Sequence, residues 1–158
     1  MRVRELMRCS PRSIGPAATL AEAGTIMERA RCGALPVVGD GEDERVVGMI
    51  TDRDVCLAVA VRDRRPSQIA VREVISGDVF TCRPQDDVRD ALAAMGDHRV
   101  RRLPVIDPAG RLVGILALDD LAVAAHADRD ESDDVLLHTE IARTLMILAR
   151  HEQRLNAS

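Results

Sequence analysis

Residues 33–55 read GALPVVGDGEDERVVGMITDRDV, and residues 101–121 repeat their pattern as RRLPVIDPAGRLVGILALDDL. In each stretch, two apolar runs flank a loop of Gly, Asp and Pro residues, a composition typical of a β-hairpin connection. Because these runs are apolar on both faces, we expect the strands to be buried. The predicted strands are residues 35–38, 46–50, 103–106 and 112–116, and the predicted loops are residues 39–45 and 107–111.

The repetition extends to both sides of the hairpins. Upstream, Val3-Arg4-Glu5 recurs as Val71-Arg72-Glu73, 68 residues further along the chain. Downstream of the loop the displacement falls to 66, so that Asp54 corresponds to Asp120. The chain is therefore a tandem duplication whose second copy has a shorter hairpin loop.

Helical periodicity surrounds each hairpin. A helix is predicted before the first hairpin, with Thr19 or Ala18 near its N-cap, and another before the second hairpin. Further helices are predicted over residues 52–62 and 119–127. The apolar positions that define the first two helices are Leu20, Ala23, Met27 and Ala30, then Val88, Ala91, Leu92 and Met95.

The predicted fold class is α/β (α+β), with two pseudo-symmetric units and a C-terminal helix. Each unit is expected to be a three-stranded sheet with two helices on one face. Since the other face is uncovered, we expect the units to pair and to leave a ligand groove between them. The predicted boundaries are 1–66, 67–127 and 128–158, the last being an acidic linker and a helix.

The C-terminal helix has a heptad-like stripe that must be buried against its own module or against a second copy. We expect self-association. The stripe consists of His138, Ile141, Leu145, Leu148, Glu152 and Leu155.

Composition excludes several functions. Arginine supplies all 22 basic residues, so a P-loop lysine and a lysine Schiff base are absent. The net charge of -4 and a single aromatic residue, Phe80, argue against nucleic-acid binding. No apolar run approaches the roughly 20 residues of a membrane span, and no signal peptide is recognised, so we expect a cytoplasmic protein. No nucleophile and base occur at recognisable spacing, so an enzyme is not expected.

The cysteines and histidines lack the spacing of a metal site, and no metal is expected. In a cytoplasmic chain, reduced and mostly buried cysteines are the favoured interpretation. The residues are Cys9, Cys32, Cys56 and Cys82, with His98, His126, His138 and His151.

The first repeat contains, in order, the segments VRELM, GPAATLAEA, GALPVVGD and VVGMITDRDV, and the second contains their counterparts VREVI, RPQDDVRDA and RRLPVIDPAGRLVGILALDDL. Together these segments resemble paired CBS domains over residues 3–125. This resemblance implies a regulatory module that binds an adenosine-containing ligand (AMP, ADP, ATP, NAD or S-adenosylmethionine), with AMP or ATP favoured. It also implies a homodimer and an unidentified protein target in trans. The alternative is a scaffold of the same fold that has lost its ligand.

The resemblance implies that Asp54 accepts hydrogen bonds from the two ribose hydroxyls and that Thr51 helps to hold the nucleotide. A carboxylate suits a vicinal diol because it offers several lone pairs. The backbone N–H groups at this helix start also favour an anion. Alternatively, Thr51 and Asp54 form a capping box, and both interpretations stay open.

The phosphate partners implied by the resemblance are Arg101 and Arg102, since the arginine fork can grip phosphate oxygens. The alternative is a solvated face at a helix end. The adenine pocket would be lined by Met49 and by Val79 and Phe80, which we expect to lie in a strand.

The second repeat keeps Asp120 but has Ala117 in place of the threonine. One hydroxyl is lost and the N-cap is poor, which puts nucleotide binding there in question. Arg12 is the nearest basic candidate for this second site. One competent composite site is therefore predicted.

Overall fold

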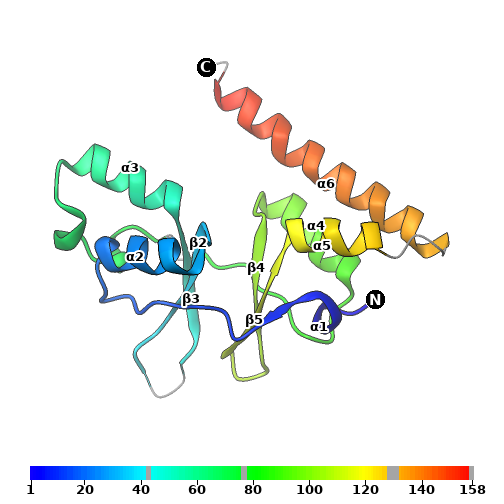
Figure 1. The fold of residues 1–158 in the computed structure, drawn as a ribbon, viewed down its shortest axis with the longest axis horizontal. Helices are drawn as coiled ribbons and strands as arrows, with labels where there is room; N and C mark the ends of the chain where they lie inside the picture. The colour runs from blue at the N-terminus through cyan, green and yellow to red at the C-terminus, as the bar shows by residue number, and fades with distance from the viewer. Residues whose placement is uncertain (42–43, 76–77, 128–131, 157–158) are drawn as a thin grey trace. The chain divides into compact units, whose positions relative to one another are not determined.

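The computed structural model describes residues 1–41, 44–75, 78–127 and 132–156 (Figure 1). Each repeat contains a helix, a β-hairpin and a second helix, as predicted, and a long helix follows. The elements in chain order are α1 (Val3–Leu6), β1 (Arg8–Cys9), α2 (Leu20–Ala30), β2 (Ala34–Val38), β3 (Val46–Thr51), α3 (Asp52–Arg62), η1 (Pro66–Gln68), η2 (Val71–Glu73), α4 (Val88–His98), β4 (Arg102–Ile106), β5 (Leu112–Ala117), α5 (Leu118–Ala127) and α6 (Ser132–Asn156).

The chain divides into two compact units. The α3 unit comprises residues 10–79 and 106–113, and the α5 unit comprises residues 1–9, 80–105 and 114–158. In the α5 unit the strand order is β1-β5-β4, with β1 antiparallel to β5. In the α3 unit β2 and β3 form an antiparallel pair. The repeat aligns β1 with residues 76–77, which lie outside the described residues.

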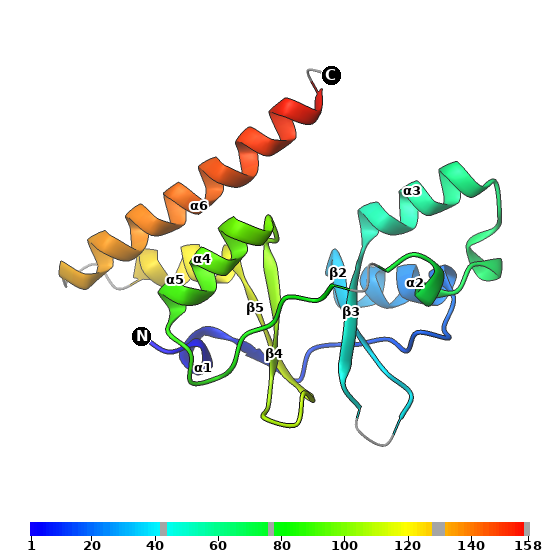
Figure 2. The ribbon, with the colours of Figure 1, turned by 180° about the vertical axis from the view of Figure 1, so that it is seen from behind.

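Each unit takes its opening segment from the other repeat. The Val3 N–H donates to the Asp86 carbonyl at 3.0 Å, and the equivalent Val71 N–H donates to the Ala18 carbonyl at 2.8 Å. Figures 1 and 2 show the N-terminal segment running beside β5. The compact units therefore differ from the sequence repeats predicted at 1–66 and 67–127.

The predicted hairpin loops are present. At the second loop the Gly110 N–H donates to the Asp107 carbonyl at 2.9 Å, and Gly110 has a φ of +86°, a conformation that disfavours a side chain. At the first, the Gly39 N–H donates to the Arg45 carbonyl at 2.9 Å. Turn chemistry thus fixes both connections.

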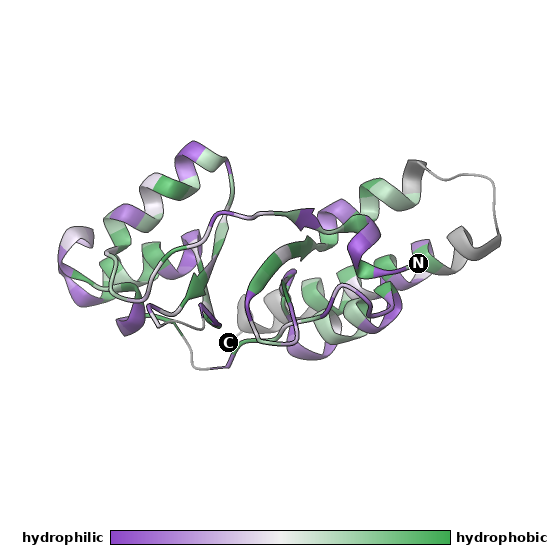
Figure 3. Ribbon diagram, turned by 90° about the horizontal axis from the view of Figure 1, so that it is seen from below, coloured by the Kyte–Doolittle hydropathy of each residue, from purple (hydrophilic) through white to green (hydrophobic). Residues whose placement is uncertain are grey.

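The core follows the predicted periodicity, and the apolar character of the strands is visible in Figure 3. The expectation that whole strands are buried is wrong for β3, where Gly48 and Ile50 point inward while Met49 and Thr51 are half-buried. Ala30 is exposed because α2 ends there. Fully burying one leucine contributes about 1.5–3 kcal/mol. The predicted helix positions found buried are Leu20, Ala23, Met27, Val88, Ala91, Leu92 and Met95.

Helix α6 packs on α4 and α5 within its own unit (Figures 1 and 2). The predicted stripe is wrong at two positions, since His138 and Leu145 are exposed. A neighbouring stripe is buried instead, and within it the Thr144 hydroxyl donates to the Leu92 carbonyl of α4 at 3.5 Å. The side chains of 152 and 155 lie outside the described residues. The buried positions are Leu137, Ile141, Thr144 and Leu148.

Candidate functional site

Thr51 and Asp54 meet at the junction where β3 passes into α3. The Asp54 N–H donates to Thr51 Oγ1 at 3.2 Å, while Asp54 Oδ2 accepts from the Thr51 N–H at 2.9 Å and from its hydroxyl at 2.7 Å. These bonds form a capping box, so the local alternative is present in the structure. It occupies only one of the two carboxylate oxygens.

The other oxygen, Asp54 Oδ1, has no hydrogen-bond partner among the described residues. Within that part of the chain, only Asp120 Oδ2 and Glu140 Oε2 are both unpaired and inaccessible to solvent. Solvent therefore reaches Asp54 Oδ1, which can accept hydrogen bonds from a ligand. Met49 precedes Thr51 on the same face of β3 and is half-buried beside it.

The start of α3 does not offer free backbone donors to an anion, contrary to the prediction. The Asp52 N–H donates to the Gly33 carbonyl at 3.1 Å, and the Arg53 N–H donates to the Asp52 carboxylate at 2.7 Å. The next N–H, that of Asp54, is held by Thr51. Because the chain's own oxygens satisfy these donors, a phosphate needs a cationic side chain elsewhere.

The second junction, between β5 and α5, has the same backbone hydrogen bond as the β3–α3 junction but different side chains. The Leu118 N–H donates to the Arg101 carbonyl at 3.0 Å, as Asp52 does to Gly33. Ala117 is buried and has no hydroxyl. Asp120 forms an ion pair with Arg8 of β1, and the hydrogen bond in this pair is the main cause that raises the pKa of the Arg8 guanidinium.

The arginine pair follows α4 in the α5 unit. The helix ends at His98, and Arg99 adopts the left-handed conformation at its C-cap. Arg101 is exposed, and Arg102 is half-buried at the start of β4. Both lie just beyond the C-terminal end of α4, and the exposure of Arg101 fits the alternative of a solvated face at a helix end as well.

Val79 and Phe80 were predicted as strand residues, which is wrong, since both lie in irregular backbone. Both are half-buried. Phe80 stacks on His98, with ring centroids 3.6 Å apart and planes inclined by 10°. One face of the phenyl ring is therefore already covered by a residue that the sequence did not single out.

The predicted site residues divide between the two units. Met49, Thr51, Asp54, Val79 and Arg12 belong to the α3 unit. Their predicted partners belong to the α5 unit, namely Phe80, Arg101, Arg102, Ala117 and Asp120.

Sequence reasoning named Arg12 for the second site and missed Arg8, which forms an ion pair with Asp120 within the α5 unit. Arg12 is exposed and belongs to the α3 unit. A signal was available, because the repeat aligns Arg8 with Ser76, which carries no charge. A charge present in only one copy of a repeat marks a position where the copies differ in chemistry.

The cysteine prediction was partly wrong. Cys82 is buried, and burial raises its thiol pKa to about 12. Cys9, on β1, and Cys56, on α3, are exposed, and Cys32 is half-buried. The described residues contain no cluster of three or more His, Cys, Asp or Glu side chains arranged to hold a metal ion.

The chain contains two copies of one α/β motif, and in each copy the second hairpin strand leads directly into a helix. The family model of the CBS domain matches residues 3–61 and 71–127. The chain belongs to the CBS domain family.

Relatives of similar length share this organisation. The CBS domain-containing protein YhcV of Bacillus subtilis is 38% identical over 121 residues, covering 77% of this chain and 83% of that protein. The crystal structure of Hypoxic Response Protein I with two coordinated zinc ions superposes with a TM-score of 0.70 at 32% identity, covering 78% of this chain and 98% of that one.

Two further structures share the fold at 22% identity. One is the CBS domain pair of protein MJ0100 in complex with 5-methylthioadenosine and S-adenosylmethionine, with a TM-score of 0.73 over 82% of this chain and 98% of that one. The other is CBSX2 in complex with AMP, with a TM-score of 0.67 over 80% of this chain and 96% of that one. Among the described residues, no helix of this chain is long and apolar enough to cross a membrane.

Proposed function

We propose that this chain is a regulatory sensor of an adenosine-containing ligand, with AMP or ATP favoured over NAD and S-adenosylmethionine. The observation that carries the proposal is the accessible Oδ1 of Asp54, which the capping box holds in place and leaves unpaired. A fixed carboxylate oxygen is suited to a ribose diol because its position costs little entropy on binding. The adenosine ligands of the MJ0100 pair and of CBSX2 support the same class of ligand.

The remaining predicted residues have distinct proposed roles. Arg101 and Arg102 supply positive charge for the phosphates, a role strengthened by the fully satisfied start of α3. Met49, Val79 and the face of Phe80 that points away from His98 contact the adenine. The proposed location is the cytoplasm, and the proposed recipient of the signal is an unidentified protein target in trans.

A homodimer is also proposed, on the basis of apolar residues exposed at matching positions. Leu57 of α3 is 51% exposed, and Val123, its equivalent in α5, is 72% exposed. Val61, one turn further along α3, is 82% exposed. Two matched apolar helix faces suit a self-complementary interface. Light scattering tests this proposal, and a monomeric mass would contradict it.

Calorimetric titration tests ligand binding, with AMP, ATP, NAD and S-adenosylmethionine as probes. Loss of charge-assisted hydrogen bonds costs about 1.5–3 kcal/mol, so Asp54→Ala should weaken AMP binding roughly 10- to 100-fold. Arg102→Ala should weaken AMP binding but not adenosine binding, since adenosine lacks the phosphate. Asp90→Ala, which removes an exposed carboxylate from α4, is the control and should bind as the wild type does.

Two results would contradict the proposal. If none of the four ligands produces heat, the chain is a scaffold, the alternative that the missing hydroxyl at Ala117 favours. If Asp54→Ala and Arg102→Ala both bind AMP as the wild type does, the ligand lies elsewhere.

A further inference from the structure

We infer that Arg8 is a specificity-determining residue that closes the ribose site of the second repeat, so that the module holds one adenosine ligand per chain. The inference rests on the proposed function, because it concerns the number of sites. It depends only on contacts within the α5 unit. Arg8 lies outside every motif that carries the family resemblance.

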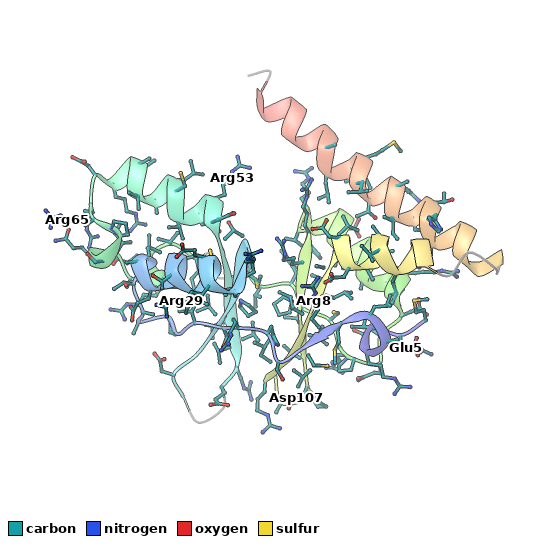
Figure 4. The ribbon with its side chains drawn as sticks, in the orientation of Figure 1. Glu5, Arg8, Arg29, Arg53, Arg65 and Asp107 are labelled. Atoms are coloured by element: carbon teal, nitrogen blue, oxygen red, sulfur yellow. The ribbon has the colours of Figure 1, made fainter. Side chains whose placement is uncertain are left out.

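Strand pairing brings Arg8 to the junction. The antiparallel ladder between β1 and β5 places Arg8 opposite Ile115, two residues before the strand ends at Ala117. From there the Arg8 Nη2 reaches Oδ1 of Asp120 in the first turn of α5 (Figure 4). The Arg8 side chain is 73% exposed and the Asp120 side chain 18% exposed.

Neither carboxylate oxygen of Asp120 is both unpaired and accessible, as Asp54 Oδ1 is. Oδ1 accepts a hydrogen bond from a guanidinium that is charged at every working pH. Oδ2 is buried where even a water molecule does not reach it, and it has no hydrogen-bond partner. A ribose diol therefore has to compete with the Arg8 guanidinium for Oδ1, and that oxygen becomes free only when Arg8 leaves.

In the α3 unit, the segment that ends at Ile75 approaches β3 in a similar way. The residue of that segment equivalent to Arg8 is not an arginine. A Cβ on Gly114 would meet the Met7 sulfur at 2.8 Å, and a Cβ on the equivalent Gly48 would meet Ile75 Cδ1 at 2.9 Å. The two opening segments thus approach their strands alike up to this point. In the sequence the next residue is Arg8 in one case and Ser76 in the other, and the neutral, short serine side chain cannot form an ion pair with a carboxylate.

Counting bound AMP tests the inference. Wild type and Arg8→Ala should be titrated with AMP at equal protein concentration, with Arg4→Ala, which removes an exposed arginine from the same segment, as the matched control. Wild type and Arg4→Ala should bind one AMP per chain, and Arg8→Ala should bind two. Arg8→Ser, which replaces Arg8 with the residue that the second repeat has at the equivalent position, should also bind two. The double variant Arg8→Ala/Ala117→Thr restores the missing hydroxyl and should bind the second AMP more tightly.

Asp120→Ala gives a second readout that does not depend on removing Arg8. If Asp120 is closed off in the wild type, this variant should bind one AMP with unchanged affinity. Reduced binding by Asp120→Ala, two AMP per wild-type chain, or one AMP per chain in Arg8→Ala would overturn the inference. An absence of AMP binding in all variants would instead overturn the proposed function, so the two failures are distinguishable.

Discussion

The β3–α3 and β5–α5 junctions have the same backbone and different side-chain chemistry. In each, the first helical N–H donates to a carbonyl before the preceding hairpin, from Asp52 to Gly33 and from Leu118 to Arg101. Thr51 caps the first helix, whereas Ala117 cannot cap the second. These backbone hydrogen bonds need no particular side chain. The two copies can therefore keep the same backbone structure while their polar side chains differ.

The largest expected effect comes from substitutions in the core. Equivalent core substitutions in the two repeats should lower the free energy of unfolding by similar amounts. Leu35 and Leu103 are equivalent, and both are completely buried. Leu35→Ala and Leu103→Ala should each lower the free energy of unfolding by about 2–5 kcal/mol, because each removes buried methyl groups and leaves a cavity. Urea denaturation measures both. A loss confined to one of the two variants would show that the cores are not equivalent.

Exchanging the caps should sharpen the contrast between the junctions. Thr51→Ala should lower the free energy of unfolding by about 1 kcal/mol, because the Asp54 N–H loses its acceptor. Ala117→Ser should raise it by less than about 1 kcal/mol, since the hydroxyl can cap α5 but must fit a buried position. Urea denaturation with Thr51→Ser as the control checks both. A destabilised Ala117→Ser would show that the second junction has no room for a cap.

The smallest expected effect concerns Glu73 and its repeat equivalent Glu5, which have different hydrogen-bond partners. Backbone donation from Ala70, followed by Arg64, lowers the pKa of Glu73, which is 4.5 in the absence of structure. A depressed carboxylate pKa stabilises the fold above pH 4.5, and this contribution disappears as pH falls through the folded value. Glu73→Gln should therefore destabilise slightly at about pH 7 and not at about pH 3.

Its repeat equivalent, Glu5, provides the control. Glu5 accepts one hydrogen bond from the Arg2 N–H, at 2.9 Å, and takes part in no ion pair within the described part of the chain. Urea denaturation of Glu73→Gln and Glu5→Gln at both pH values compares them. An equal pH dependence in the two variants would refute the assigned role of the Arg64 and Ala70 contacts.

The repeat made much of the fold predictable. Thr19 and Thr51 were recognisable as caps because their hydrogen bonds join residues three positions apart. The buried stripe of α6 was not predictable, since the helix offers two overlapping apolar faces and its packing against α4 and α5 decides between them. Local pattern determines where a helix begins, but the packing partner determines which face is buried.

The same limit applies to the site. The Thr51–Asp54 pair is local and was found, whereas the Arg8–Asp120 pair joins residues 112 positions apart and depends on β1 pairing with β5. A strand of two residues carries too little periodicity to be recognised from the sequence. The register of the repeat predicted that the copies differ, but only the fold revealed which groups meet.

The exchanged opening segments have a consequence for the origin and assembly of the chain. Because Val3 bonds to Asp86 and Val71 bonds to Ala18, an isolated repeat lacks the segment that completes its own fold. A single-copy ancestor with this architecture would have traded its first residues with a second molecule, as in a domain-swapped dimer. Fusion of two copies of such a gene would join the two exchanging molecules in one chain. Separately expressed halves of this chain should still bind each other as complementary fragments.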